Sequence, residues 1–155
     1  MKNMINQYKL GFSLYGLLAF AIQELPYLPW LICPPADNPL ANNKPASVFW
    51  GILEQCGGIL TVALLIIIIP KSVNRSNFKS NSFLISVLCL VTYYFCWICY
   101  FSGITNAWLL VFGLSAVVPI YYFFVALWLK NKFAIITSII FFIGHTVSNM
   151  LNFLL

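Results

Sequence analysis

The chain has 155 residues, of which 62% are hydrophobic and only 7% are charged. A soluble globule of this size needs far more polar surface, so the composition excludes a soluble domain and indicates an integral membrane protein. The net charge of +5 would suit nucleic-acid binding in a soluble protein. Here the basic residues lie in short segments between apolar runs, a pattern that membrane topology explains. We therefore expect the lipid bilayer as a partner and no nucleic acid.

Five apolar runs are each long enough to cross the bilayer as a helix, which takes about 20 residues. They extend over residues 10–32, 48–69, 82–101, 107–129 and 133–155. The sequence therefore predicts an all-α integral membrane protein, a bundle of five transmembrane helices that forms one domain over residues 1–155. Pro26 and Pro29, with Pro34 and Pro35 after them, predict an irregular end to the first helix. Ser47 is a suitable N-cap for the second.

The basic residues indicate how the chain is oriented. Seven of the eight lie before the first run or in alternate connections, namely Lys2, Lys9, Lys71, Arg75, Lys79, Lys130 and Lys132. Because cytoplasmic loops retain Lys and Arg, we expect a cytoplasmic N-terminus, a cytoplasmic loop at 70–81, an external loop at 33–47 and an external C-terminus. The richness in Asn, Lys and Ile is typical of a bacterial chain, so we expect a multi-pass protein of the plasma (inner) membrane.

The acidic and imidazole side chains inside the predicted spans are Glu24, Glu54 and His145. Such groups are costly in lipid and are functional candidates for that reason. With a helical rise of about 1.5 Å per residue, all three lie about 9 to 12 Å below the outer face of the hydrocarbon core. We therefore expect one polar layer that joins the first, second and fifth helices.

Small and polar residues recur at helical spacing on three predicted helices. The stripes are Ser47, Gly51, Glu54, Gly58 and Thr61 in the second helix, Ser82, Ser86, Cys89, Tyr93, Cys96 and Tyr100 in the third, and Ser138, His145, Asn149 and Asn152 in the fifth. Such residues let helices approach closely and bond across the contact. We expect the stripes to converge on an outward-open pocket whose candidate ligand- or ion-binding residues are Gln23, Glu24, Glu54, Gln55, Tyr93, His145 and Asn149.

Two interpretations of this polar layer remain open. Two carboxylates at one depth in a low dielectric cannot both ionise cheaply, which suits a site for a proton, a cation or an amine. Alternatively, protonated Glu, neutral His and the amides bond to one another as packing contacts. The first interpretation predicts a protein that binds or translocates a small or cationic ligand or ion. A chain this small should act as a homo-oligomer or as a subunit of a membrane complex.

Cys96-Trp97-Ile98-Cys99 forms a CxxC pair near the outer end of the third span. The pair resembles those of quinone-linked disulfide generators of the bacterial and vitamin K reductase types, over these four residues. The resemblance implies electron transfer between loop cysteines, the helix pair and a quinone. This chain has one loop cysteine, Cys33, instead of a pair. A membrane thiol/quinone oxidoreductase that uses Cys96 and Cys99 is therefore an alternative function.

A third possible function is that of a non-catalytic immunity or assembly protein whose external loop binds a partner. We find no other catalytic signature, and a single histidine excludes a His-rich zinc site. We therefore expect no metal site and favour a non-enzymatic function. The sequence does not identify a cofactor.

Overall fold

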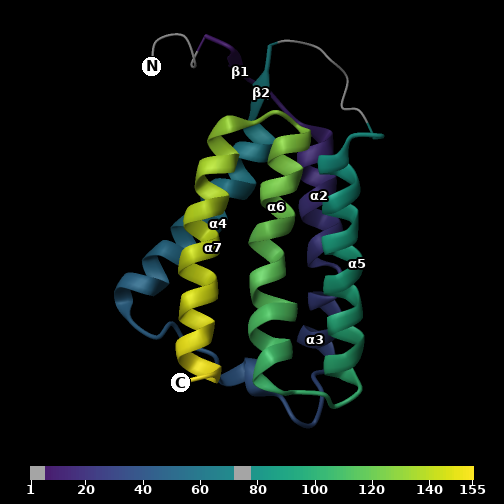
Figure 1. The fold of residues 1–155 in the computed structure, drawn as a ribbon, viewed down its shortest axis with the longest axis vertical. Coiled ribbons are helices and arrows are strands. Elements are labelled where there is room, and N and C mark those ends of the chain that lie inside the picture. The colour runs from purple at the N-terminus through teal and green to yellow at the C-terminus, as the bar shows by residue number, and fades with distance from the viewer. Residues whose placement is uncertain (1–5, 72–77) are drawn as a thin grey trace.

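The computed structural model describes residues 6–71 and 78–155, which form a bundle of helices that run side by side (Figure 1). Two short strands lie at one end of the bundle, and the loop between α3 and α4 lies at the other. We call these the strand end and the loop end. The elements are β1 (Tyr8–Leu10), α2 (Leu14–Glu24), α3 (Tyr27–Ile32), the 3₁₀ turn η1 (Pro39–Asn42), α4 (Val48–Ile67), β2 (Ile68–Pro70), α5 (Asn81–Phe101), the π-helix η2 (Leu109–Ala116), α6 (Val117–Trp128) and α7 (Lys132–Phe153).

Four helical stretches are long and apolar enough to cross a membrane: α4, α5, η2 together with α6, and α7. They correspond to the second to fifth predicted spans. Side-chain caps explain where three of them begin, because Ser47, Ser80 and Asn131 each accept a hydrogen bond from a backbone N–H three residues later. The expected N-cap at Ser47 is confirmed.

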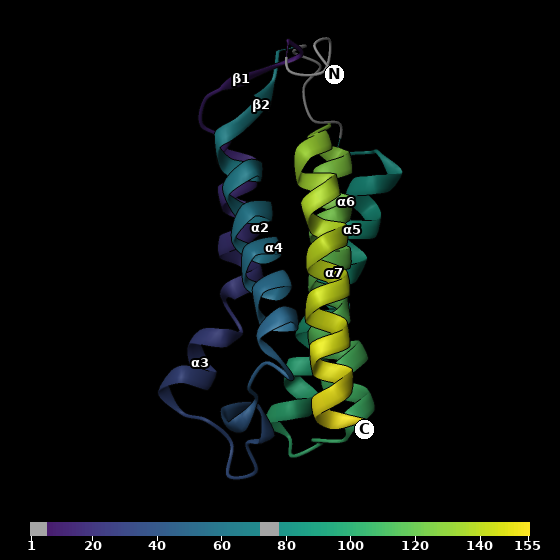
Figure 2. The same ribbon diagram turned by 90° about the vertical axis from the view of Figure 1, so that its left-hand side faces the viewer.

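Residues 10–32 do not form the single helix expected of the first span. Leu10 belongs to β1, and the helical part is divided into α2, of 11 residues, and α3, of six. Pro26 lies at the break, where its ring disfavours continuation of the helix. After the break α3 turns away from the axis of α2 (Figure 2). The irregularity predicted from the prolines is therefore present from Pro26 onward, and α2 is too short to cross the bilayer alone, which takes about 20 residues.

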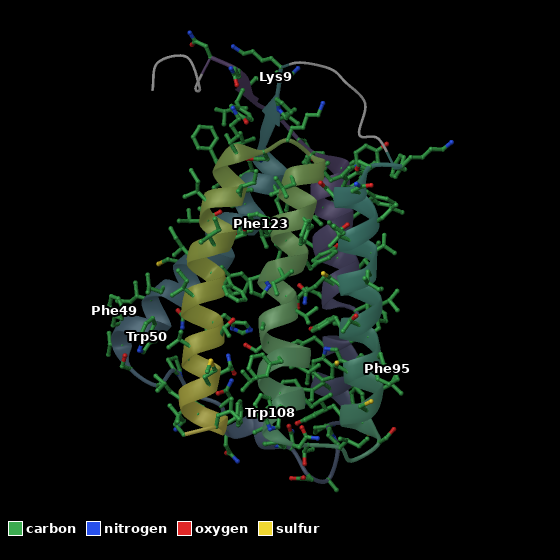
Figure 3. All side chains as sticks on the ribbon, in the orientation of Figure 1. Lys9, Phe49, Trp50, Phe95, Trp108 and Phe123 are labelled. Atoms are coloured by element: carbon green, nitrogen blue, oxygen red, sulfur yellow. The ribbon has the colours of Figure 1, made fainter. Side chains whose placement is uncertain are left out.

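The two strands pair antiparallel, with Tyr8 opposite Pro70 and Leu10 opposite Ile68. The expected second helix, 48–69, therefore ends two residues early, at Ile67. Pro70 has no N–H and disfavours helix in the residue before it, while the β-branched Ile68 and Ile69 suit a strand. An otherwise helical fold thus has a small sheet at the end where Lys9 lies (Figure 3).

Glycines bring α4 and α7 into close contact. A Cβ on Gly57 would lie 2.8 Å from the Cα of Phe141, and one on Gly144 would lie 2.6 Å from the backbone nitrogen of Glu54. Only glycine leaves room for the opposite backbone at these two positions. The hydroxyls of Thr61 and Thr137 bond across the same interface at 2.9 Å. This close packing brings the middle of α4 against the residue that precedes His145.

Candidate functional site

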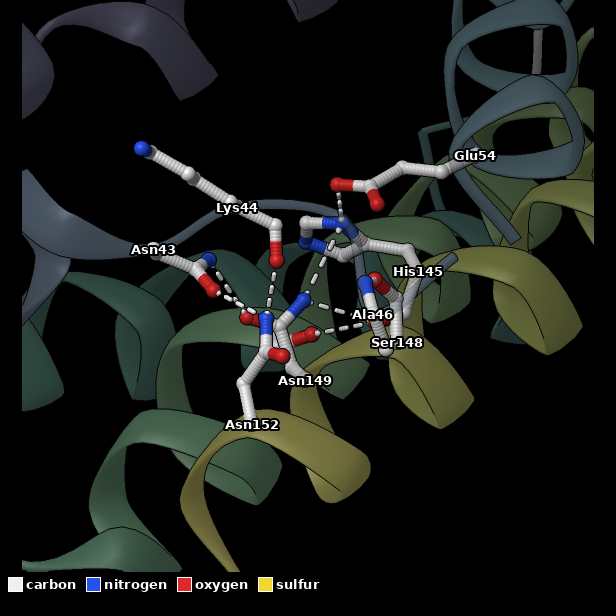
Figure 4. Close-up of polar contacts among 9 residues, drawn as sticks. Asn43, Lys44, Ala46, Glu54, His145, Ser148, Asn149 and Asn152 are labelled. Atoms are coloured by element: carbon white, nitrogen blue, oxygen red, sulfur yellow. Dashed lines mark hydrogen bonds and ion pairs between the residues drawn. The ribbon is translucent and has the colours of Figure 1, made fainter. Parts of the chain in front are cut away.

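Glu54 and His145 lie within hydrogen-bond distance of each other between α4 and α7 (Figure 4). Glu54 Oε1 lies 2.8 Å from His145 Nδ1, and the two side chains are 23% and 22% exposed. Because Gly144 lies against the backbone of Glu54, the two side chains face each other at the closest approach of the helices. The pair leaves His145 Nε2 free of any hydrogen bond to residues 6–71 and 78–155. A protonated His145 would find its counter-charge in Glu54.

Asparagine side chains extend this contact to the loop end (Figure 4). Asn149 Nδ2 donates to the backbone oxygen of His145 at 2.7 Å, and Asn43 Nδ2 donates to Asn149 Oδ1 at 2.8 Å. Asn152 Nδ2 in turn donates to Asn43 Oδ1 at 2.6 Å. These bonds attach the loop at 33–47 to α7. Our sequence reasoning missed Asn43, because it lies in a loop without periodicity.

Gln23 is buried, and its amide is bonded to two tyrosines. Tyr122 OH donates to Gln23 Oε1 at 2.6 Å, while Gln23 Nε2 donates to Tyr93 OH at 3.1 Å. The predicted residues Gln23 and Tyr93 are thus brought together, with α6 supplying a third member. Tyr122 was also missed, since it lies in a continuous apolar run with no polar stripe. This network suits the packing interpretation for Gln23.

Glu24 differs from the other acidic residues in its surroundings. Asp37 accepts a hydrogen bond from Thr105, and Glu54 is paired with His145. Glu24 is partly buried and makes no hydrogen bond or ion pair with any residue in the described ranges 6–71 and 78–155. No contact joins the carboxylates of Glu24 and Glu54 within those ranges. The two acidic residues therefore have separate environments, whereas the sequence suggested a pair.

A cavity of about 380 Å³ lies between α2, α3, α5, η2 and α7, and we call it the polar cavity. Of the predicted site residues it is lined by Gln23, Glu24, Tyr93, His145 and Asn149. Leu40 and Asn43 cover it from the loop end. Its wall therefore combines segments that are distant in sequence. Glu24 and His145, which were predicted to lie at one depth, are both part of this wall.

A second cavity of about 420 Å³, which we call the apolar cavity, lies between α2, α4 and α6. It shares four lining residues with the polar cavity, Gln23, Glu24, Val118 and Phe141. The remainder of its lining is Phe20, Gly58, Ile59, Val62, Ala63 and Tyr122. Ile59, which lines this cavity from α4, is 70% exposed. Glu24 thus lies where a polar space meets an apolar one.

Two predicted residues do not line the polar cavity. Glu54 is bonded to His145 but is not part of the cavity wall. Gln55 is exposed on the outer face of α4. Helical position explains the difference, because Gln55 is turned by about 100° from Glu54 around the axis of the helix.

Cys96 and Cys99 are both free thiols. Cys96 is buried, and its sulfur lies so close to Gly113 that a Cβ there would approach it to 2.6 Å. Cys33 is exposed in the loop. Within residues 6–71 and 78–155, no group of three or more His, Cys, Asp or Glu side chains is placed to hold a metal ion. Cys96 therefore fills space in the contact between α5 and η2.

Comparison with protein-family models, with curated proteins and with solved structures found no match.

Proposed function

We propose that this chain is a multi-pass membrane protein that binds a small organic cation in the polar cavity, with Glu24 as the counter-ion. The observation that carries the proposal is the environment of Glu24. Its carboxylate borders both cavities and has no partner within the described residues, whereas Gln23 and Tyr93 beside it are bonded to each other. A carboxylate in a low dielectric is strongly attracted to a cation that replaces its lost water.

The lining of the polar cavity supports an organic cation as the ligand. Tyr27 and Trp30 stack with ring centroids 4.8 Å apart, and Trp97 lies at 6.3 Å from Tyr27. All three line the same cavity as Glu24. Aromatic faces beside a carboxylate attract quaternary and protonated amines through cation–π contacts. The volume of about 380 Å³ lies within the range usual for small-molecule sites, about 300 to 1,000 Å³.

The π-helix η2 supports a binding role for this part of the bundle. Pro119 in α6 has no N–H to donate to Ser115, and the wider helical turns lie directly before it, over Leu109–Ala116. Such π-helical turns are frequent at functional sites. Leu110, Leu114 and Ser115 of η2 all line the polar cavity. The widened turns therefore shape the wall opposite Glu24.

The proposal includes a topology. We infer that α2 and α3 together make a fifth crossing, which puts the N-terminus in the cytoplasm and the C-terminus outside the plasma membrane. The segregation of charge supports this, because Lys9, Lys71, Lys130 and Lys132 lie at the strand end, away from the loop at 33–47. A homo-oligomer or a complex with other membrane subunits would complete any pathway for translocation.

Choline and its uncharged carbon isostere 3,3-dimethylbutanol test the proposal. Trp30 and Trp97 line the polar cavity, so binding should change the tryptophan fluorescence of the purified full chain. We expect a saturable change with choline and a much smaller one with the isostere. Glu24→Gln should weaken choline binding at least about tenfold, since a tenfold change corresponds to about 1.4 kcal/mol, a modest value for a desolvated charge pair.

Asp37→Asn is the matched control, because it removes one negative charge at the loop end from a residue that does not line the polar cavity. It should leave choline binding unchanged. Equal binding by the wild-type chain and Glu24→Gln would contradict the proposal.

A further inference from the structure

We propose that the strand end carries a site for a phosphate group, formed by Lys71, Lys130 and Lys132. The site is independent of the cation site proposed above. A cavity of about 510 Å³ lies at this end, and we call it the lysine cavity. Its lining consists of the three lysines with Gln7, Tyr8 and Pro70. The lysines come from two segments that are distant in sequence, the end of β2 and the turn between α6 and α7.

Tyr8 holds these segments in place. Its side chain is buried, with its ring 5.1 Å from that of Phe133. Its hydroxyl donates to the backbone oxygen of Lys130 at 3.0 Å and accepts from the backbone N–H of Lys132 at 3.2 Å. The backbone N–H of Lys71 donates to the oxygen of Gln7 at 2.8 Å. The backbones of all three lysines are therefore joined to one short segment around Tyr8.

The turn that carries two of the lysines is also fixed. Asn131 is almost fully buried, and its side-chain amide donates to the backbone oxygens of Leu64 at 2.7 Å and Ile68 at 2.9 Å. Lys130 has a φ of 56°, in the left-handed region that a residue other than glycine adopts rarely. The surrounding bonds hold it there, directly after α6. The lysine cavity is thus enclosed by an ordered frame of backbone.

The charge of the lysine cavity is not balanced by any acidic residue. The chain has three acidic residues in all, Glu24, Asp37 and Glu54. Glu24 lines the polar cavity, Glu54 is paired with His145, and Asp37 is bonded to Thr105 at the loop end. The three lysines are exposed, so water screens part of the repulsion between them, and an anion bound among them would remove more of it. Such an anion must come from outside the chain.

A phosphate group is the anion that suits this arrangement. It offers several oxygens to three ammonium donors and carries more negative charge density than a carboxylate. Trp128 lies at the same end and contacts Tyr15, Phe78 and Phe83, an aromatic cluster of the kind found where a membrane meets water. At that level a phosphate belongs either to a lipid head group or to a soluble phosphate ester.

Thermal unfolding of the full chain in a neutral detergent without phospholipid tests the site. Phosphatidylglycerol is added in one arm and glycerol 3-phosphate in the other. A ligand that binds the folded chain raises its unfolding temperature. We expect at least one arm to stabilise the wild-type chain, and the arm that does so identifies the source of the phosphate. Lys71→Gln, Lys130→Gln and Lys132→Gln should each weaken binding about fivefold.

Lys9→Gln is the matched control. Lys9 follows Tyr8 on β1, is exposed at the same end and does not line the lysine cavity. It should respond to phosphate as the wild-type chain does. An equal loss in Lys9→Gln, or no stabilisation of the wild-type chain in either arm, would overturn the proposal. If a Gln variant fails to fold in the detergent alone, the Arg variant at that position must keep the response, and its loss there would overturn the proposal equally.

Discussion

At the scale of single residues, Glu54 contacts His145, whereas the sequence suggested that Glu54 pairs with Glu24. Glu24 and His145, which were expected to lie at one depth, line the same cavity. Depth does not determine the direction in which a side chain points. The sequence could not predict that Glu54 contacts His145, because that depends on the close contact at Gly144. The same reason hid the contacts of Asn43 and Tyr122, which belong to no polar stripe.

Glu54→Gln, His145→Gln and the double variant test this contact. Each single change should lower the free energy of unfolding by about 1 to 3 kcal/mol, because it weakens a hydrogen bond to a charged group between two partly buried side chains. The double variant should lose less than the sum of the two. Thermal unfolding in detergent measures all three. Gln55→Ala, on the exposed neighbour of Glu54, should stay within about 0.5 kcal/mol of the wild-type chain.

Additive losses in that cycle would show that the contact contributes nothing. The alternative pairing predicted from the sequence is tested in the same way. Glu24→Gln and Glu54→Gln should combine additively, because no contact joins the two carboxylates within the described residues.

At the scale of elements, the long apolar runs were predictable and their interruptions were not. The helices α4, α5 and α7 begin within two residues of their expected starts, because length, hydropathy and the caps act locally. The break between α2 and α3 lies at Pro26, which indicated it, but the sequence did not show that α3 would turn away from α2. The pairing of β1 with β2 joins segments about 60 residues apart. Nothing local in the sequence records such a contact.

Gly144→Ala tests the close contact of α4 with α7. The new Cβ would lie 2.6 Å from a backbone nitrogen of α4, so the helices must separate. We expect a loss of about 1 to 3 kcal/mol in unfolding free energy, as for other overpacked sites. The coupling between Glu54 and His145 should weaken in this background.

Gly58→Ala provides the comparison for Gly144→Ala. Its Cβ would meet the ring of Phe141 at 3.3 Å, and a side chain can yield where a backbone cannot. Alanine also favours helix over glycine by up to about 1 kcal/mol, so this variant should be nearly as stable as the wild-type chain. Equal destabilisation by the two substitutions would contradict the packing argument.

At the scale of the whole molecule, the basic connections in the described residues lie at the strand end of the bundle, as their alternation along the sequence predicts. The turn that holds Lys130 and the strand that holds Lys9 lie together, opposite the loop at 33–47. Positions 2 and 75, which also entered the topology argument, lie outside the described residues. The sequence predicted this segregation because charge in a membrane protein follows the sides of the bilayer rather than tertiary contacts. The cavities could not be predicted, since they depend on the angles and distances between the packed helices.

Cysteine labelling in intact cells tests the proposed orientation. In a background in which Cys33 is replaced by serine, an added cysteine at Asn42, in the exposed turn η1, should react with an impermeant thiol reagent. A cysteine at Lys79, at the start of α5, should react only after the cells are opened. Labelling at position 79 from outside would reverse the topology.

The apolar cavity beside Glu24 has a consequence for how a ligand would arrive. At the loop end, Asn43 is bonded to Asn149, and Asn38 accepts a hydrogen bond from Tyr100, so the loop is tied down over the polar cavity. In the apolar cavity, the bond of Tyr122 to Gln23 joins α6 to α2, while the lining that α4 contributes, Gly58, Ile59, Val62 and Ala63, is apolar. An apolar amine that dissolves in the bilayer would reach Glu24 from the lipid through the apolar cavity. Its concentration in the lipid would already exceed that in water. Its potency would then follow its partition between water and membrane more closely than its concentration in the medium.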